Sequence, residues 1–346
     1  MDADKHMDFV GCACAPVVLV RSAVAEHTLR FQGWAKLAIC VLSAAHICGA
    51  AAADAGSGSP IAPSSRVTRT YGVAPATSGQ SSTADMFASG SRALANKDYA
   101  QAYRWLRSAA ERGHAKAQTA LAGMYLVGEG VKADDAEALK WYRKAAEQGE
   151  VEAQSRLGLM HAHGRGVAMD EEAAVKWFRL AADQGDAAAQ TNLGVMYLEG
   201  RGIERNPIAA AKWIREAALQ DERLAQHNLG LMFRDGLGVE RDDIEAAWWF
   251  RKSAEIGHPD AQAHLGVMYR EGRGVPQDDA EAVQWLRKGA AQGNALAQYY
   301  LGVSLAEGRG VDQNRDEAVK WLTISARQGH ALARDYLWAN GNITVD

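Results

Sequence analysis

A period of 36 residues, repeated without a gap, constrains this chain more than any other feature of its sequence. The period is marked by a glutamine column and a tryptophan column: Gln118, Gln154, Gln190, Gln226, Gln262 and Gln298, and Trp105, Trp141, Trp177, Trp213, Trp249, Trp285 and Trp321. Complete periods run from Ala115 to His330. Periods of about 20 to 50 residues are typical of solenoids, in which each unit buries its apolar face only by stacking on its neighbours.

Each period contains two segments with a helical pattern. In residues 187–222, Ala189, Leu193 and Met196 recur at the spacing of one helical face. A second segment begins at Asn206 and Pro207, because asparagine caps a helix and proline suits its first position. We expect this second helix to bury Ala210, Trp213, Ala217 and Ala218. The chain therefore predicts an all-α fold, a right-handed α-solenoid of antiparallel helix pairs.

Two glycines recur between the two helices of each unit, as in "LGVMYLEGRG" at residues 193–202. A phosphate-binding loop would need a preceding strand, and either a lysine followed by serine or threonine or a third glycine. Neither pattern is present, so we interpret the glycines as the turn that ends the first helix. A glutamate three residues after the Asp or Asn that follows this turn predicts a capping box in four units: Glu137, Glu245, Glu281 and Glu317.

The pattern A-x-A-Q-x-x-L-G-x-M-Y-x-x-G-x-G-V, followed by Asp and E-A-x-x-W-x-x-x-A-A-x-x-G, resembles the Sel-one-like repeat family, a relative of the tetratricopeptide repeat. Six copies of this pattern cover residues 115–330. Residues 84–114 lack the long loop between the helices and resemble a tetratricopeptide unit at the N-terminal end. Residues 331–346 keep Ala333 and Leu337 in phase and then stop, which predicts a C-terminal capping helix and tail.

The first 83 residues differ from the repeats. Lys36, an apolar run over 37–45 and the small residues that follow make 1–53 a leader that resembles a signal peptide, with an uncleaved anchor or a leader without a targeting role as alternatives. Residues 54–83 are dominated by Gly, Ser, Pro, Ala and Thr and predict a flexible linker. We therefore expect an exported protein, periplasmic or secreted.

Charge and cysteine content exclude several function classes. A formal charge of -4 argues against a nucleic-acid partner, which normally calls for a basic patch. All four cysteines lie in the first 48 residues, so the repeats have no thiolate ligand and no disulfide. His161 and His163 are two apart on a helix, point to different faces and have no third ligand nearby. We predict neither a metal nor a cofactor, and no catalytic motif is present.

The positions that vary between units are the candidates for binding. In tetratricopeptide-like units the first helix lines the inner face of the solenoid. Two of its positions vary here. One carries Ala120, Arg156, Asn192, Asn228, His264 and Tyr300, and the other carries Leu126, Ala162, Leu198, Arg234, Arg270 and Ala306. The binding candidates among them are Arg156, Asn192, Asn228, His264, Tyr300, Arg234 and Arg270. Columns that pack between units would be uniform, so these columns either face plain solvent or contact a partner. The tryptophan column, by contrast, is interpreted as core rather than as a stacking platform.

The resemblance implies binding rather than catalysis, because members of this family generally act as adaptors or scaffolds and many bacterial members are exported. We therefore expect a non-enzymatic scaffold that binds a protein or peptide on its concave face. Two alternatives stay open. One is a hydrolase acting on cell-wall material or β-lactams, an activity linked to cysteine-rich exported relatives whose paired cysteines these repeats lack. The other is an RNA-binding helical repeat, against which the acidic charge argues.

Overall fold

The computed structural model describes residues 82–341, and within this range every regular element is a helix. The leader over 1–53 and nearly all of the linker over 54–83 lie outside the described residues. The first helices of successive units are α2 (Thr83–Ala95), α4 (Ala115–Val127), α6 (Val151–His163), α8 (Ala187–Glu199), α10 (Arg223–Asp235), α12 (Pro259–Glu271) and α14 (Ala295–Glu307). The second helices are α3 (Tyr99–Glu111), α5 (Asp135–Glu147), α7 (Glu171–Asp183), α9 (Pro207–Ala218), α11 (Asp243–Glu255), α13 (Asp279–Ala291) and α15 (Arg315–Arg327).

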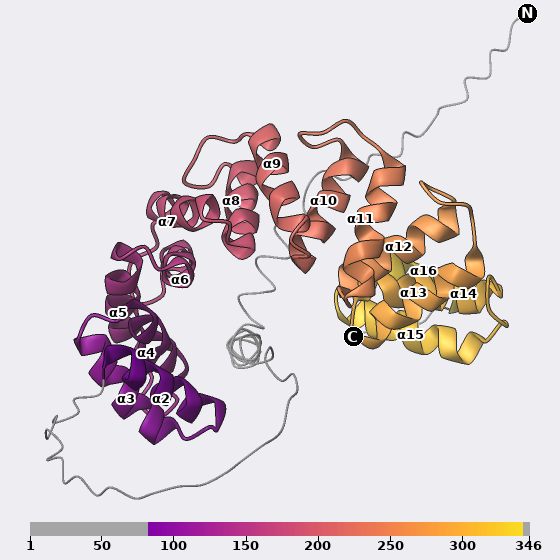
Figure 1. The fold of residues 1–346 in the computed structure, drawn as a ribbon. Coiled ribbons are helices and arrows are strands. Elements are labelled where there is room, and N and C mark those ends of the chain that lie inside the picture. The colour runs from indigo at the N-terminus through magenta and orange to yellow at the C-terminus, as the bar shows by residue number, and fades with distance from the viewer. Residues whose placement is uncertain (1–81, 342–346) are drawn as a thin grey trace, which may run out of the picture.

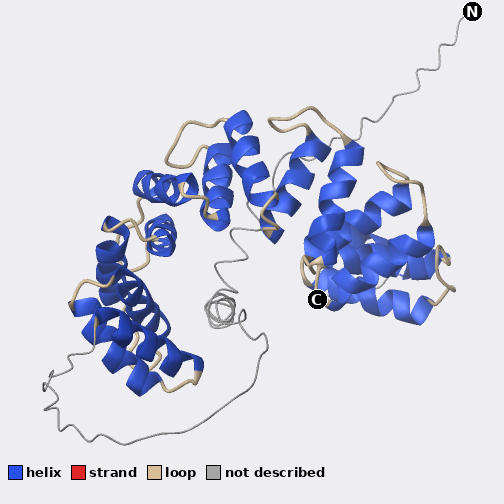
Figure 2. Ribbon diagram, in the orientation of Figure 1, coloured by secondary structure: helices blue, strands red, loops and turns tan. Residues whose placement is uncertain are grey.

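The helix pairs stack into an arc (Figure 1). Each helix packs mainly against the one before it and the one after it in the chain. The units are joined by loops, with no strand in the described range (Figure 2). The predicted all-α solenoid of antiparallel helix pairs is confirmed. A last helix, α16 (Ala331–Gly341), packs against α15.

The ends of the helices follow the turn chemistry of the repeat. Gly200 ends α8 with φ 73° and Gly202 follows with φ 62°, a left-handed conformation that suits glycine. In each unit of residues 115–330, Asp or Asn caps the second helix by accepting backbone N–H groups, as Asp242 does from Ile244 and Glu245.

The expected capping boxes are half formed. The N-cap side chain accepts from the backbone N–H of the glutamate, as Asp134 does from Glu137 and Asp278 from Glu281. The return bond is absent from both units, because the N–H of Asp134 donates to the carbonyl of Tyr125 and that of Asp278 to the carbonyl of Tyr269.

In every first helix except α4, a glycine allows close contact with the second helix of the same unit. A Cβ on Gly230 would lie 2.7 Å from the ring of Phe250, and one on Gly194 would lie 2.5 Å from Cγ1 of Ile214. The side chain received at this contact belongs to the residue directly after each tryptophan. These residues are buried in every unit: Leu106, Tyr142, Phe178, Ile214, Phe250, Leu286 and Leu322.

The prediction that the tryptophans form the core is therefore only partly correct. Trp141 and Trp249 are buried, Trp105 is 36% exposed and the others are half-buried. Adjacent residues of a helix point about 100° apart, so when the following residue faces its own first helix the tryptophan lies at the rim. Trp213 packs there against the cluster that contains Phe178 and Leu193.

Polar contacts connect one unit with the next. An arginine in the inter-helix loop pairs with an acid at the start of the preceding second helix in four places: Arg165 with Asp135, Arg201 with Glu171, Arg273 with Asp243 and Arg309 with Asp279. The repeated glutamine also spans a junction, since Gln154 donates to the carbonyl of Ala146 and accepts from Gln184. Polar atoms inside a packed array need such partners.

The unit at 223–258 lacks the arginine–acid pair with the preceding unit and lacks the second glutamine of the glutamine pair. Leu237 and Pro207 stand where other junctions have the arginine and the acid. Ile256 replaces the second glutamine, and Oε1 of Gln226 is buried without a hydrogen-bond partner in the described part of the chain. Directly before this unit, Asp221 takes the place of a glycine and keeps a φ of 59°. The regular connections are therefore weakest around this unit.

The last helix differs from all first helices at the position of the packing glycine. One period after Gly302 stands Trp338, which is 59% exposed. A second helix packed as in the other units would collide with this indole, because even a Cβ at the position of Gly302 would lie 2.7 Å from Leu322. The side chain therefore ends the repeat pattern of packing at α16.

We predict opposite effects for alanine at two helical glycines. Gly230→Ala should lower the free energy of unfolding by about 1 to 3 kcal/mol, because the new Cβ overlaps the fully buried ring of Phe250. Gly123→Ala should raise it by up to about 1 kcal/mol, because its nearest neighbour is the Tyr142 hydroxyl at 3.6 Å and alanine favours a helix. Urea denaturation followed by circular dichroism measures both. Changes of the same sign in both variants would contradict the packing argument.

Candidate functional site

The first helices lie on the inner side of the arc, as α4 and α6 do relative to α5 and α7 in Figure 1. Consistent with this placement, first helices of neighbouring units contact one another, α6 with α8 and α12 with α14. Their exposed positions thus form one surface that runs from unit to unit. We call the two variable positions identified from the sequence the inner columns.

All seven predicted site residues lie on first helices and are half-buried in the structure: Arg156, Asn192, Asn228, Arg234, His264, Arg270 and Tyr300. Asn192 makes no side-chain hydrogen bond within residues 82–341. Arg156 lies 3.6 Å from Glu152 on its own helix, and its side chain is 24% exposed. These two residues keep polar groups available at the surface.

The two later arginines are held by neighbours. Arg234 forms two hydrogen bonds of 2.7 Å with the carboxylate of Asp235. Arg270 reaches into the next unit, where it donates to Ser304 at 2.9 Å and to Glu307 at 2.8 Å. Its guanidinium carbon also lies 5.8 Å from the centre of the Tyr300 ring. These arginines connect units as well as facing the inner side.

A stack of histidines occupies the junction between α10 and α12. The ring of His227 lies parallel to those of His258 and His264, with centroids 4.6 Å and 5.6 Å away. Phe250 closes the stack at 5.0 Å from His264, and Nη1 of Arg234 lies 3.5 Å from Nδ1 of His264. We call His227, His258 and His264 the histidine stack. Sequence reasoning identified only His264 of these three.

The stack replaces a hydrogen bond found in earlier units. The residue after the repeated glutamine donates there to the N-cap acid of the next first helix, as Thr119 does to Glu150 at 3.0 Å and Ser155 does to Asp186 at 3.2 Å. His227 and His258 occupy the same two positions one to three units later. The fixed 31-residue separation of such pairs is the signal that would have located this contact from the sequence.

Burial favours the neutral forms of His227 and His264 in the stack. Burial, and then the neighbouring His258 and His264, hold the pKa of His227 well below its ordinary value. Burial and the guanidinium of Arg234 lower the pKa of His264 from 6.5 to about 3, opposed by Asp235. Neither ring nitrogen of His227 has a hydrogen-bond partner among the described residues. A proton on the stack would therefore be poorly solvated.

His161 and His163, the two histidines considered as a metal pair, differ in burial. His161 is 8% exposed with Nδ1 buried, whereas His163 is exposed. Within residues 82–341 no group of three or more His, Cys, Asp or Glu is arranged to hold a metal ion. Across the same range no helix is both long enough and apolar enough to cross a bilayer.

The fold and its repeating contacts define an α-solenoid of the helical-repeat class. A family model described as Sel1 repeat matches seven consecutive units, at residues 79–114, 115–150, 151–186, 187–222, 223–258, 259–294 and 295–330. The chain belongs to this family. The first matched unit includes residues 84–114, which resemble a tetratricopeptide unit in sequence. In this unit only residues 96–98 join α2 to α3. Proteins of the family generally serve as protein-interaction scaffolds.

Two solved structures resemble this chain. One is c5321, a protective antigen of uropathogenic Escherichia coli strains, with 38% identity and a TM-score of 0.69 over 77% of this chain and 59% of that one. The other is a Sel1 repeat protein from Oxalobacter formigenes, with 32% identity and a TM-score of 0.64 over 69% of this chain and 96% of that one. The present chain thus spans 59% of the length of c5321. Comparison with curated proteins gave no match.

We predict that acid weakens the array at the histidine stack. A histidine whose pKa is lowered in the folded state binds fewer protons there than in the unfolded state. Its neutral form therefore contributes fully to the free energy of unfolding above pH 6.5, and this contribution is lost as the pH falls from 6.5 toward 3. His264→Asn, which introduces the residue that Asn192 and Asn228 supply in other units, should reduce this slope. Thermal unfolding at about pH 7 and about pH 5 measures it.

The matched control is His163→Gln, since His163 is exposed and lies outside the stack. This variant should keep the pH dependence of the wild type. An unchanged slope in His264→Asn would assign the acid sensitivity to other groups.

Proposed function

We propose that this protein is a non-catalytic scaffold that binds an extended segment of a partner protein on the inner face of the arc. The observation that carries the proposal is the contrast between columns. The packing columns keep one kind of residue: the helical glycine recurs in most units, and the buried residue that faces it is always a large apolar or aromatic one. The first inner column instead changes from alanine to arginine, asparagine, histidine and tyrosine, and the second changes between leucine, alanine and arginine. Variation limited to an accessible surface is the pattern of a repeat protein adapted to a particular partner.

The placement of the asparagines suits an extended chain. Asn192 and Asn228 occupy the same position on α8 and α10. The two helices belong to neighbouring units, so a chain that runs along the inner face passes one asparagine and then the other. An asparagine amide both donates and accepts, so each can pair with a main-chain N–H and C=O of the same peptide. Arg156 in the preceding unit adds a cation at the same column.

We further propose that the protein acts outside the cytoplasm, in the periplasm or beyond. The support is the leader resembling a signal peptide in residues 1–53. The similarity to c5321, which is described as a protective antigen, fits exposure of such a protein to the host. N-terminal sequencing of the mature protein from cell fractions tests both cleavage and location.

The inner-face proposal predicts where a partner can be cross-linked. A photo-reactive amino acid at position 192 on α8 should capture one recurring protein from an envelope extract. The same amino acid at position 212 on α9 should not, because Lys212 is an exposed residue of a second helix. Mass spectrometry identifies the captured protein. Capture at position 212 alone would place the interaction on the outer face.

Affinity with the purified partner then tests the residues. The triple variant Arg156→Ala, Asn192→Ala and Asn228→Ala should weaken binding at least about tenfold, since each hydrogen bond to a charged or buried group contributes about 1 kcal/mol or more. The matched triple variant on second helices, Lys176→Ala, Lys212→Ala and Lys320→Ala, should bind as the wild type does. Circular dichroism checks that both variants stay folded. Equal losses in the two variants would refute a specific inner-face site.

A further inference from the structure

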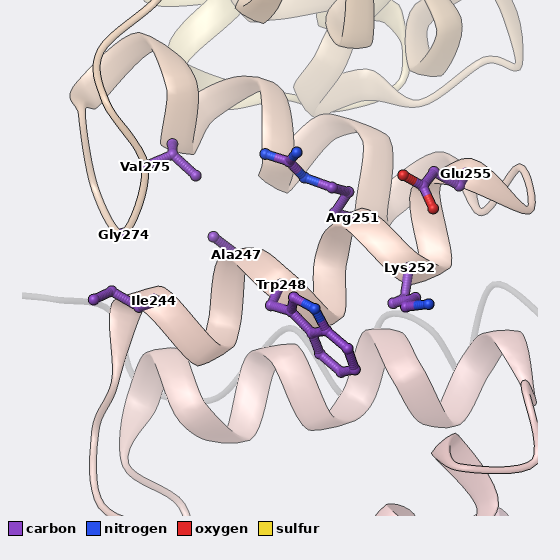
Figure 3. Close-up of a pocket in the computed structure, with 8 residues that line it drawn as sticks. All are labelled: Ile244, Ala247, Trp248, Arg251, Lys252, Glu255, Gly274 and Val275. Atoms are coloured by element: carbon purple, nitrogen blue, oxygen red, sulfur yellow. The ribbon is translucent and has the colours of Figure 1, made fainter.

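A hollow on the second helix α11 has no counterpart in the function proposed above. Its volume is about 430 Å³, and Figure 3 shows its lining on α11 and on the loop that precedes α13. Ile244, Ala247, Trp248 and Val275 give it an apolar surface, and Arg251, Lys252 and Glu255 lie along the rest of the helix. We call this hollow the Trp248 pocket.

The pocket exists because of a few residues that depart from the repeat. Its framework is shared, since an arginine stands at the position of Arg251 and a glycine with Val or Ile at those of Gly274 and Val275 in other units. We call the six units of residues 115–330, which have the long loop between their helices, the long units. At the position of Trp248 the other long units have Lys140, Lys176, Lys212, Gln284 and Lys320. Ala247 stands where most units have leucine or valine. The small side chain leaves the space, and the indole forms its wall.

Packing does not account for Trp248. Its side chain is 47% exposed, and the neighbouring Ile244 is 71% exposed. The indole meets the adjacent Trp249 edge to face, with centroids 4.4 Å apart at 87°, while Trp249 itself is buried. Adjoining exposed apolar side chains on a soluble surface mark interaction sites, and tryptophan is enriched among the residues that dominate binding energy.

The charge beside the pocket is positive. Nζ of Lys252 lies 5.4 Å from the centre of the Trp248 ring, and within residues 82–341 Lys252 has no carboxylate within ion-pair distance. Arg251 donates a hydrogen bond to the hydroxyl of Tyr269 and keeps its charge. Arg251 and Lys252 precede Glu255, the acidic residue of the lining, along α11. A partner next to the indole therefore meets two positive groups first.

We propose that the Trp248 pocket is a second docking site, which receives one aromatic side chain of an acidic peptide segment. The aromatic ring packs between Trp248, Ile244 and Val275 over Ala247. Carboxylates flanking it pair with Lys252 and Arg251. A volume at the low end of the usual range of about 300 to 1,000 Å³ for ligand pockets fits one anchoring side chain. The site lies on a second helix, so it is independent of the inner face.

The test uses fluorescein-labelled peptides and the purified wild-type protein. The probe has one phenylalanine flanked by glutamates, and its comparison peptides replace the phenylalanine by alanine or the glutamates by lysines. Fluorescence polarisation should show saturable binding of the first peptide only, weakened by added salt. Equal binding of the lysine peptide, or no binding of the acidic one, would overturn the proposal.

Two variants restore residues found in other units, so both are compatible with the fold. Trp248→Lys and Ala247→Val should each weaken binding at least about tenfold, the first by removing the anchor and the second by filling the hollow. Lys320→Ala, at the position equivalent to Trp248 in the sixth long unit, should leave the affinity unchanged. Unchanged binding in both pocket variants would refute the site.

A second copy of the chain is the competing occupant of this surface. Sedimentation velocity of the wild type and of Trp248→Lys separates the two. A monomer in both supports peptide docking. Self-association that disappears in Trp248→Lys would show that the indole serves an interface between copies, and the peptide proposal would then be wrong.

Discussion

The contact between a helical glycine and one large buried side chain sets the geometry of every long unit but the first. The glycine removes the Cβ that would otherwise separate the two helices, and the partner residue fills the space. In the first long unit Ala122 takes this place and the partner is Tyr142. The large residue on the second helix is Phe, Ile or Leu in the other long units, while the glycine on the first helix stays the same. The distance between the two helices is therefore kept although the volume of the buried side chain changes. The remaining features of the array depend on this spacing.

Units that share one backbone spacing can differ in how they are connected. Most junctions use an arginine with an acid and a pair of glutamines. The unit at 223–258 lacks the arginine–acid pair with the preceding unit and the second glutamine, although Asp243 still pairs with Arg273 of the next unit. Gly230 and Phe250 still hold its two helices together. Its first helix carries His227 of the histidine stack, and its second helix carries most of the Trp248 pocket. The unit with the fewest regular connections is thus the one with the most individual chemistry.

The sequence predicted the period, the helix pairs, the glycine turns and the Asp or Asn caps, because each depends on residues close together in the chain. It predicted less well which side chain fills the core. Trp213 and Ile214 are both apolar and adjacent, and only the position of Gly194 on the facing helix decides between them. The roles of Arg234 and Arg270 were also beyond reach, because their contacts with His264, Ser304 and Glu307 cross 30 or more residues.

Trp338 sets where the repeated packing between helix pairs stops. A copy of the 36-residue unit inserted between two inner units would find a glycine, a large partner and matching caps on both sides. The same copy added after α16 would meet Trp338 where those units have glycine. One side chain thus limits the number of units that can stack at this end, and with it the length of the inner surface.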